Sequence, residues 1–149
     1  MQNWRMQLHP ADSQRSIKHC LDSLAAGFMG LDFEKDPGDL RVADKKSVKQ
    51  SEKDYFDFAL KMQPEDKVLI ISHHYPFALV TVESDYNYIK TPVGEIGVWF
   101  RHFRRIKSPQ FYFDRVTNPN SWQQLTMTDT ISSLKDCAGD SYRLIESWK

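Results

Sequence analysis

Apolar and polar residues follow three spacings along this chain, and each spacing is typical of one kind of element. Alternation is typical of a strand with one buried face, and a spacing of three and four residues is typical of an amphipathic helix. A short unbroken apolar run is typical of a strand buried on both faces. We therefore predict strands at residues 4–8, 28–33, 68–72, 77–82, 86–89, 97–106 and 111–116, with a strand or loop at 125–128. Helices are predicted at residues 12–27, 55–62 and 141–148.

Turn-forming residues separate these elements. Residues 34–46 are charged and contain Pro37 and Gly38, which predicts a loop, and residues 118–120 predict a turn. Gly30 lies inside a predicted strand, where the missing side chain leaves room for a close backbone approach or a bulge. Several strands with helices at the edges indicate an α+β fold, built as a small mixed β-barrel with peripheral helices.

Length and composition fit one globular domain. The chain has 149 residues, 40% hydrophobic and 27% charged, so we expect a single domain over residues 1–149. No unbroken apolar run exceeds four residues, and the amino terminus lacks a basic stretch followed by an apolar one. Cys20 and Cys137 are too few for a disulfide scaffold. We expect a cytoplasmic protein with no membrane partner.

Charge is balanced overall but not along the chain. The net charge is zero, yet residues 101–149 hold eight Lys and Arg against five Asp and Glu. The excess is concentrated in Arg101, Arg104, Arg105 and Lys107. A local basic cluster binds phosphate even when the whole chain is neutral, so these four residues are the candidate phosphate contacts.

Aromatic residues make up 13% of the chain, and several lie among these cations. Alternation along a strand places Trp99, Arg101 and Phe103 on one face. The other face then carries Phe100, His102 and Arg104. Rows of cations and rings are typical of nucleic-acid surfaces, in which cations contact phosphates and rings stack on bases. Taken alone, such a run is also typical of an ordinary solvated strand face.

Common catalytic motifs are missing from the sequence. It has no phosphate-binding loop, no dinucleotide fingerprint and no nucleophile elbow. His73 and His74 are adjacent, so on a strand they point to opposite faces and do not suit one metal ion. Nor does the chain carry the acidic pair with a lysine that is typical of metal-dependent nucleases. We therefore expect no enzyme activity, no cofactor and no metal.

Two short segments are candidates for a binding pocket. His73, His74 and Tyr75 follow a strand predicted to be buried, where a scaffold presents functional side chains. Asp32 and Phe33 end another strand, where a carboxylate can bond the edge of a base while a ring stacks on its face. The alternative in each case is structural, with the rings in the core and Asp32 capping a turn.

Five segments in order make a pattern that covers nearly the whole chain. They are Trp4 with Arg5, residues 26–33, residues 64–71, residues 93–106, and residues 125–131 followed by 142–145. This order resembles the EVE domains of the PUA-like superfamily, which also contains the YTH readers. Such domains read modified bases, including at the amino termini of McrBC-type modification-dependent restriction enzymes. The chain departs from the family in having Phe33 where many relatives carry Trp, and His73–His74 in place of a glycine-richer loop.

The resemblance implies a reader that flips a modified base of DNA into an aromatic cage. Phe33, Tyr75 and Trp99 would wall the cage, and Asp32, His73 and His74 would contact the base edge. Arg101, Arg104, Arg105 and Lys107 would hold phosphates. A nuclease or NTPase, as a partner chain or a fused domain, would supply any cleavage. The alternatives are an RNA-binding PUA-like domain, a small acid–base enzyme using His73, His74 and Asp32, and a protein-interaction module.

Overall fold

The computed structural model describes residues 1–7, 22–72, 75–98, 100–111, 131–134 and 139–147. Its strands are β1 (Asn3–Gln7), β2 (Phe28–Leu31), β3 (Lys67–Ser72), β4 (Tyr75–Val82), β5 (Asn87–Tyr88), β6 (His102–Phe111) and β7 (Ile131–Leu134). Its helices are α2 (Phe56–Leu60) and α4 (Asp140–Ser147), with 3-10 turns η1 (Lys45–Ser47), η2 (Gln50–Tyr55) and η3 (Gly94–Ile96). Residues 22–25 are also helical.

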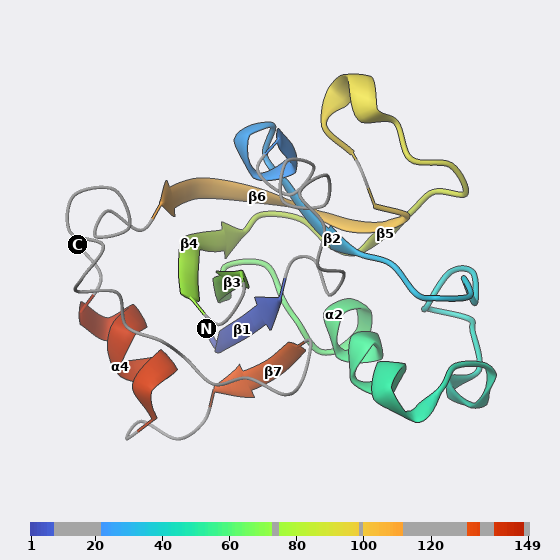
Figure 1. Cartoon of the computed structure of the whole chain (residues 1–149), viewed down its shortest axis with the longest axis horizontal. Helices are drawn as coiled ribbons and strands as arrows, with labels where there is room; N and C mark the ends of the chain where they lie inside the picture. The colour runs from blue at the N-terminus through green and yellow to red at the C-terminus, as the bar shows by residue number, and fades with distance from the viewer. Residues whose placement is uncertain (8–21, 73–74, 99, 112–130, 135–138, 148–149) are drawn as a thin grey trace.

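The strands form one mixed sheet that curls into a half-barrel (Figure 1). Their order is β2-β6-β4-β3-β1-β7, and β5 pairs with β6 beside this path. β1 and β3 run parallel, and the other pairs are antiparallel. The α+β class and the curled mixed sheet with few helices agree with the sequence prediction.

Both faces of the central strand β3 are buried, as its unbroken apolar run predicts. Val68 and Ile70 belong to the large core inside the curl. Leu69 and Ile71 point to the outer face, where they form a second cluster with Ile145 of α4. Helix α4 therefore covers one part of the outer face, and η2 with α2 packs on the inner side (Figure 1).

The structure corrects several predicted boundaries. The strand predicted from residue 97 begins only at His102. η3 ends at Ile96, and Gly97, which caps it, has a φ of 84° in the left-handed region, which is not a strand conformation. β4 begins two residues earlier than predicted, at Tyr75. β7 was not predicted as a separate strand. The predictions for residues 112–116, 118–120 and 125–128 lie outside the described residues.

Gly30 makes the close approach that its place in a strand predicts. A Cβ atom at this position would lie 2.5 Å from the carbonyl oxygen of His102 and 2.6 Å from the Cβ of Phe100. Any side chain would therefore force β2 and β6 apart. In the part of the chain that the structure describes, no helix is long and apolar enough to cross a membrane.

Candidate functional site

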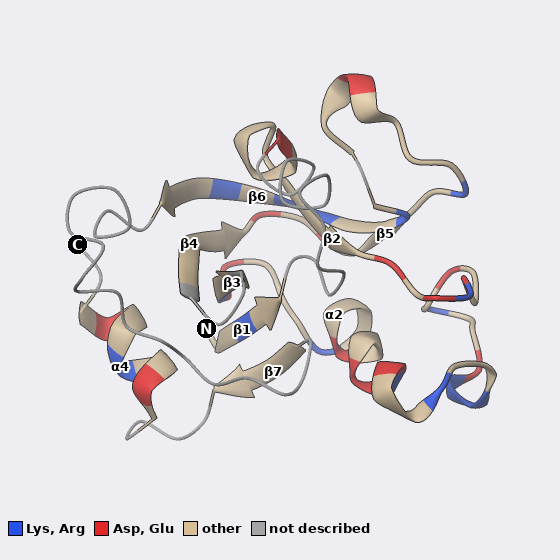
Figure 2. Ribbon diagram, viewed as in Figure 1, with Lys and Arg blue, Asp and Glu red and all other residues tan. Residues whose placement is uncertain are grey.

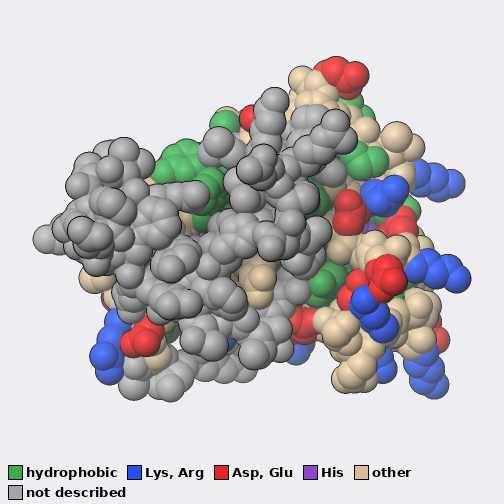
Figure 3. Space-filling model, viewed as in Figure 1, with side chains coloured by type: hydrophobic (Ala, Val, Ile, Leu, Met, Phe, Trp, Pro, Cys, Tyr) green, Lys and Arg blue, Asp and Glu red, His purple; other side chains and the backbone are tan. Residues whose placement is uncertain are grey.

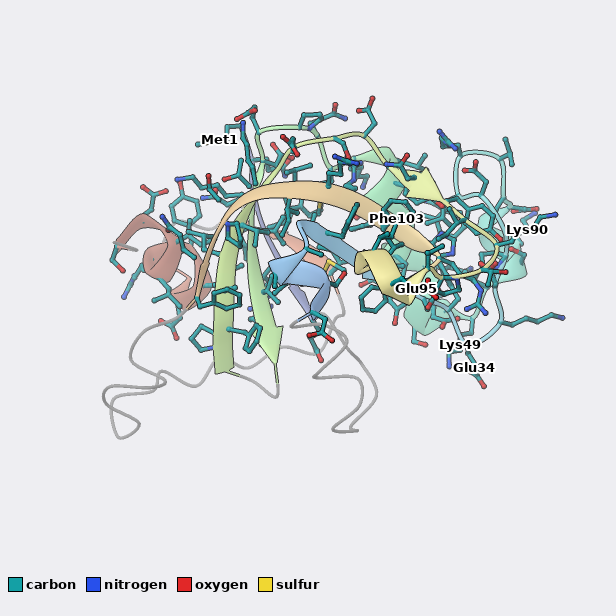
Figure 4. The ribbon with its side chains drawn as sticks, turned by 90° about the horizontal axis from the view of Figure 1, so that it is seen from above. Met1, Glu34, Lys49, Lys90, Glu95 and Phe103 are labelled. Atoms are coloured by element: carbon teal, nitrogen blue, oxygen red, sulfur yellow. The ribbon has the colours of Figure 1, made fainter. Side chains whose placement is uncertain are left out.

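The basic segment lies on β6, and alternation along this strand divides its side chains between two faces. His102, Arg104 and Ile106 point inward and are buried. Phe103 and Lys107 are half-buried on the outer face, and Arg105 is exposed there. Figure 2 shows the basic positions along β6, and Figure 4 places Phe103 toward the η3 end of the strand, away from α4.

Phe28 of β2 joins these outward side chains, since it lies directly opposite Arg105 in the β2–β6 register. The guanidinium carbon of Arg105 lies over the Phe28 ring, 5.6 Å from its centre. The rings of Phe28 and Phe103 meet edge to face, with centres 5.7 Å apart. We call Phe28, Phe103, Arg105 and Lys107 the outer strip.

The cations in and beside the outer strip differ in their acidic partners. Lys107 pairs with Glu65 at 2.5 Å, and Arg101 pairs with Asp32 at 3.5 Å. Arg105 makes no ion pair with any described residue, and its guanidinium contacts the Phe28 ring. Its side chain is therefore the member of the predicted phosphate set that is best placed to meet an anion.

Two of the six cations in the loops between residues 34 and 54 have carboxylate partners. Figure 3 shows basic and acidic side chains gathered together on that side, over the loops between residues 34 and 54. Lys49 pairs with Glu34, as Figure 4 shows, and Arg41 pairs with Asp39 at 2.6 Å. Arg105 differs from Arg41 and Lys49 in making no ion pair with a described residue.

The prediction that Arg104 contacts phosphate is wrong, because this side chain is only 2% exposed. Its donors are occupied by backbone carbonyls of Phe58, Ala59, Met62 and Ser84, at distances from 2.7 to 3.3 Å. Burial lowers the pKa of Arg104 to about 10, against the attraction of Asp85 and Asp66. The side chain remains charged at neutral pH and ties α2 to the sheet.

The prediction that Phe33 walls a pocket is also wrong. Its side chain is 7% exposed, and its ring packs against Tyr55, Phe56 and His102 with centres 5.0 to 6.2 Å apart. Phe33 is therefore a core residue, which is the structural alternative that the sequence left open.

Asp32 differs from its neighbour Phe33 because its carboxylate is about one-third exposed. Oδ1 accepts a hydrogen bond from the backbone N–H of Arg101 at 3.1 Å. Burial raises the pKa of Asp32, although Arg101 and His102 oppose this. The structure thus leaves about one-third of the Asp32 carboxylate accessible near the start of β6, beside its partner Arg101.

A buried polar network that the sequence did not reveal lies behind this region. His102 is 0% exposed, and its Nδ1 lies 2.6 Å from the Tyr86 hydroxyl oxygen. Its Nε2 lies 2.9 Å from Oδ1 of Asp36, whose Oδ2 accepts the Tyr88 hydroxyl at 2.6 Å. Alternation along β6 placed His102 on the same face as Arg104, but no local pattern indicated its partners Asp36, Tyr86 and Tyr88.

The hydrogen bonds of the network assign its protons. The Asp36 carboxylate only accepts, so the hydrogen of a neutral His102 ring lies on Nε2, and Nδ1 accepts the Tyr86 hydroxyl hydrogen. The Tyr86 oxygen also accepts the backbone N–H of Leu40 at 3.1 Å. Burial lowers the pKa of His102 despite the nearby carboxylates, which agrees with a neutral ring. Burial also raises the pKa of Tyr86, so its hydroxyl stays protonated.

The remaining predicted site residues cannot be placed by their side chains. His73, His74 and Trp99 lie outside the described residues, and the side chain of Tyr75 is not described. The prediction that Tyr75 shares one pocket with Asp32 is wrong, because the strand register separates their backbones. Tyr75 begins β4 beyond the end of β6, where Ala78 pairs with Phe111, whereas Asp32 lies beside Arg101 at the start of β6. Among the described residues, no three His, Cys, Asp or Glu side chains gather as a metal ion would require.

Comparison with known proteins adds no assignment to this geometry. A scan against protein-family models finds no match to the chain, and neither does a search of curated proteins. The functional argument therefore depends on the side chains themselves.

Proposed function

We propose that this chain is a PUA-like module of the EVE type that binds nucleic acid and recognises a modified base in DNA. The observation that carries this proposal is the outer strip, in which Arg105 lies over Phe28 beside Phe103, with no acidic partner among the described residues. Aromatic rings beside a cation on a sheet face match the chemistry of bases and phosphates. The curled mixed sheet supports the proposal because it suits a small PUA-like barrel.

In this proposal the base pocket lies near Asp32, at the start of β6. Asp32 offers an accessible carboxylate for the base edge, and Trp99 stays as a predicted pocket wall. Tyr75 is left out of this pocket because it lies at the opposite end of the sheet from Asp32. His73 and His74 lie outside the described residues, and their contact with a base stays a prediction. Flipping a base out of a duplex costs a few kcal/mol, and stacking on one ring returns about 1–3 kcal/mol. Each buried methyl carbon on the base adds roughly 0.8 kcal/mol, which gives a modest selectivity for a methylated base.

The module would bind and not cleave, so a nuclease or NTPase chain or a fused domain would supply the reaction. DNA is proposed before RNA because modified DNA is what the resembling domains of restriction enzymes read. An RNA-binding module would instead bind RNA more tightly than DNA of the same sequence.

A panel of oligonucleotides that differ in one modified base tests the function. Fluorescence anisotropy would compare methylated duplex DNA, its unmodified counterpart and RNA of the same sequence at one salt concentration. We expect the methylated duplex to bind tightest, and Trp99→Ala to lose that preference while the melting temperature stays unchanged. Arg143→Ala, an exposed arginine on α4, is the matched control. Equal binding of every modified and unmodified duplex would refute the reader function, and tighter binding of RNA would favour the alternative.

A further inference from the structure

We propose that Arg105 and Phe28 form a stacking subsite for an unpaired nucleobase, separate from the base pocket near Asp32. This inference rests on the proposed function, since it assumes that the module binds nucleic acid. It goes further by naming the ligand of the outer strip as a single-stranded or locally opened nucleotide.

Phe28 and Arg105, the two residues of the subsite, both lie on strands that pair with each other. Phe28 and Arg105 face each other across β2 and β6, and the neighbouring pair is Gly30 with Phe103. The N–H of Arg105 donates to Oγ of Ser84 at 2.9 Å, which fixes the other side of β6. Phe103 supports the Phe28 ring at an interplanar angle of 79°. The platform is therefore built before any ligand arrives.

The guanidinium itself is the surface that a base would meet. Its carbon lies over the Phe28 ring, 5.6 Å from the centre, while the side chain as a whole is exposed. A guanidinium is planar and carries donors at its edge, so a base can stack on its plane while a phosphate accepts from its N–H groups. Lysine has the charge but not the plane, which makes Arg105→Lys the informative substitution.

An unpaired base fits this platform better than a paired one. In a duplex, both faces of every base are covered by neighbouring bases, so a flat platform can reach only the backbone. In a single strand the faces are free, and stacking on a side chain tolerates any base. Lys107 lies two residues further along the same face and would meet the next phosphate of a strand that follows β6.

The experiment separates stacking from charge. The probes are a labelled oligothymidylate of about 12 nucleotides and an abasic oligomer of the same length, which keeps the phosphates and lacks the bases. We expect wild-type protein to bind the oligothymidylate about 5- to 150-fold more tightly than the abasic oligomer. Arg105→Lys should remove most of that difference without weakening the abasic complex, and Phe28→Leu should act in the same way. Arg143→Lys on α4 is the control.

Three results would overturn the subsite. These are equal binding of the two probes by wild-type protein, unchanged binding of the oligothymidylate by Arg105→Lys, and competition by polyglutamate as effective as that by oligothymidylate. The last result would define an anion surface for acidic proteins. Discrimination between methylated and unmodified duplexes is measured separately, so the reader function can hold while the subsite fails. A melting temperature equal to wild type checks that each variant is folded.

Discussion

Arg104 and Arg105 are neighbours with the same side chain and opposite surroundings. Arg104 points into the core and bonds carbonyls at the end of α2, whereas Arg105 points outward over Phe28. Composition cannot distinguish them. They differ because alternate residues of β6 point to opposite faces of the sheet. Arg104 is therefore structural, and Arg105 is a candidate ligand contact.

Removal of the Arg104 guanidinium should destabilise the fold. Arg104→Ala leaves the carbonyls of Phe58 and Met62 buried without donors, and each such group costs about 1–3 kcal/mol. We expect a loss of at least about 2 kcal/mol in the free energy of unfolding, measured by urea denaturation. Arg105→Ala should stay within about 0.5 kcal/mol of wild type, as exposed substitutions usually do. Equal effects of the two changes would contradict the assignment of Arg104 to the core.

His102 should make stability fall as the solution becomes acidic. Burial lowers the pKa of His102 in the folded chain, so the unfolded chain takes up this proton first, near the ordinary value of about 6.5. Stability therefore decreases as pH falls below that value, and it returns as pH rises. A second ring proton, on Nδ1, would also point at the hydroxyl hydrogen of Tyr86, which disfavours protonation in the folded chain. We expect the melting temperature to drop between about pH 7.5 and about pH 5.5.

His102→Gln isolates this contribution from the other histidines. A glutamine amide can still donate to Asp36 but does not titrate. The variant should be less stable than wild type near neutral pH and should lose less on acidification. An identical drop in melting temperature for both proteins would assign the pH dependence to other groups.

At the scale of elements, the contact between β2 and β6 depends on Gly30. Gly30→Ala places a methyl group against the backbone oxygen of His102, which cannot swing away as a flexible side chain would. We expect a cost of about 1–3 kcal/mol in the free energy of unfolding, the usual range for overpacking. Gly38→Ala is the comparison, because its Cβ meets nothing within 4 Å and only its φ of 87° opposes the change. Thermal melts of both variants measure the difference, and a Gly30→Ala protein as stable as wild type would show that the strands can separate freely.

Periodicity identified most elements but not their exact ends. The apolar run of β3 predicted a strand buried on both faces because its pattern is local. The start of β6 was wrong because the chain makes a 3-10 turn and a left-handed residue at Gly97, which alternation does not encode. β7 was missed because its short sequence, Ile131–Leu134, becomes a strand by pairing with β1.

The candidate site was predictable only in part, for a related reason. Alternation correctly separated Phe103 from His102 and Arg104, which lie within β6, but it did not show which face is buried, so Arg104 was misassigned. The network around His102 joins residues up to 66 positions apart in the chain, and no local pattern indicates it. Phe33 and Asp32 are adjacent, yet one is in the core and the other is accessible, and only the packed structure separates them.

At the scale of the whole molecule, two parts of the outer sheet face differ in what lies on them. α4 covers the part formed by β3 and β4, through Ile145 against Leu69, Ile71 and Leu79. The part formed by β2 and β6 carries the outer strip instead. On this part, Phe28 and Phe103 are half-buried, and Arg105, which lies opposite Phe28, is exposed.

This division predicts how duplex binding depends on salt. Each phosphate contact contributes about 0.9 to the slope of log affinity against log salt concentration, because binding releases condensed counterions. Arg105→Ala should lower the magnitude of the slope by about 0.9, and the double variant with Lys107→Ala by about 2. Affinity would be measured by anisotropy over a salt series with one unmodified duplex, because phosphate contacts are independent of sequence. Arg143→Ala, on α4, should leave the slope unchanged, and a slope equally unaffected by the outer-strip variants would place the phosphate contacts elsewhere on the molecule.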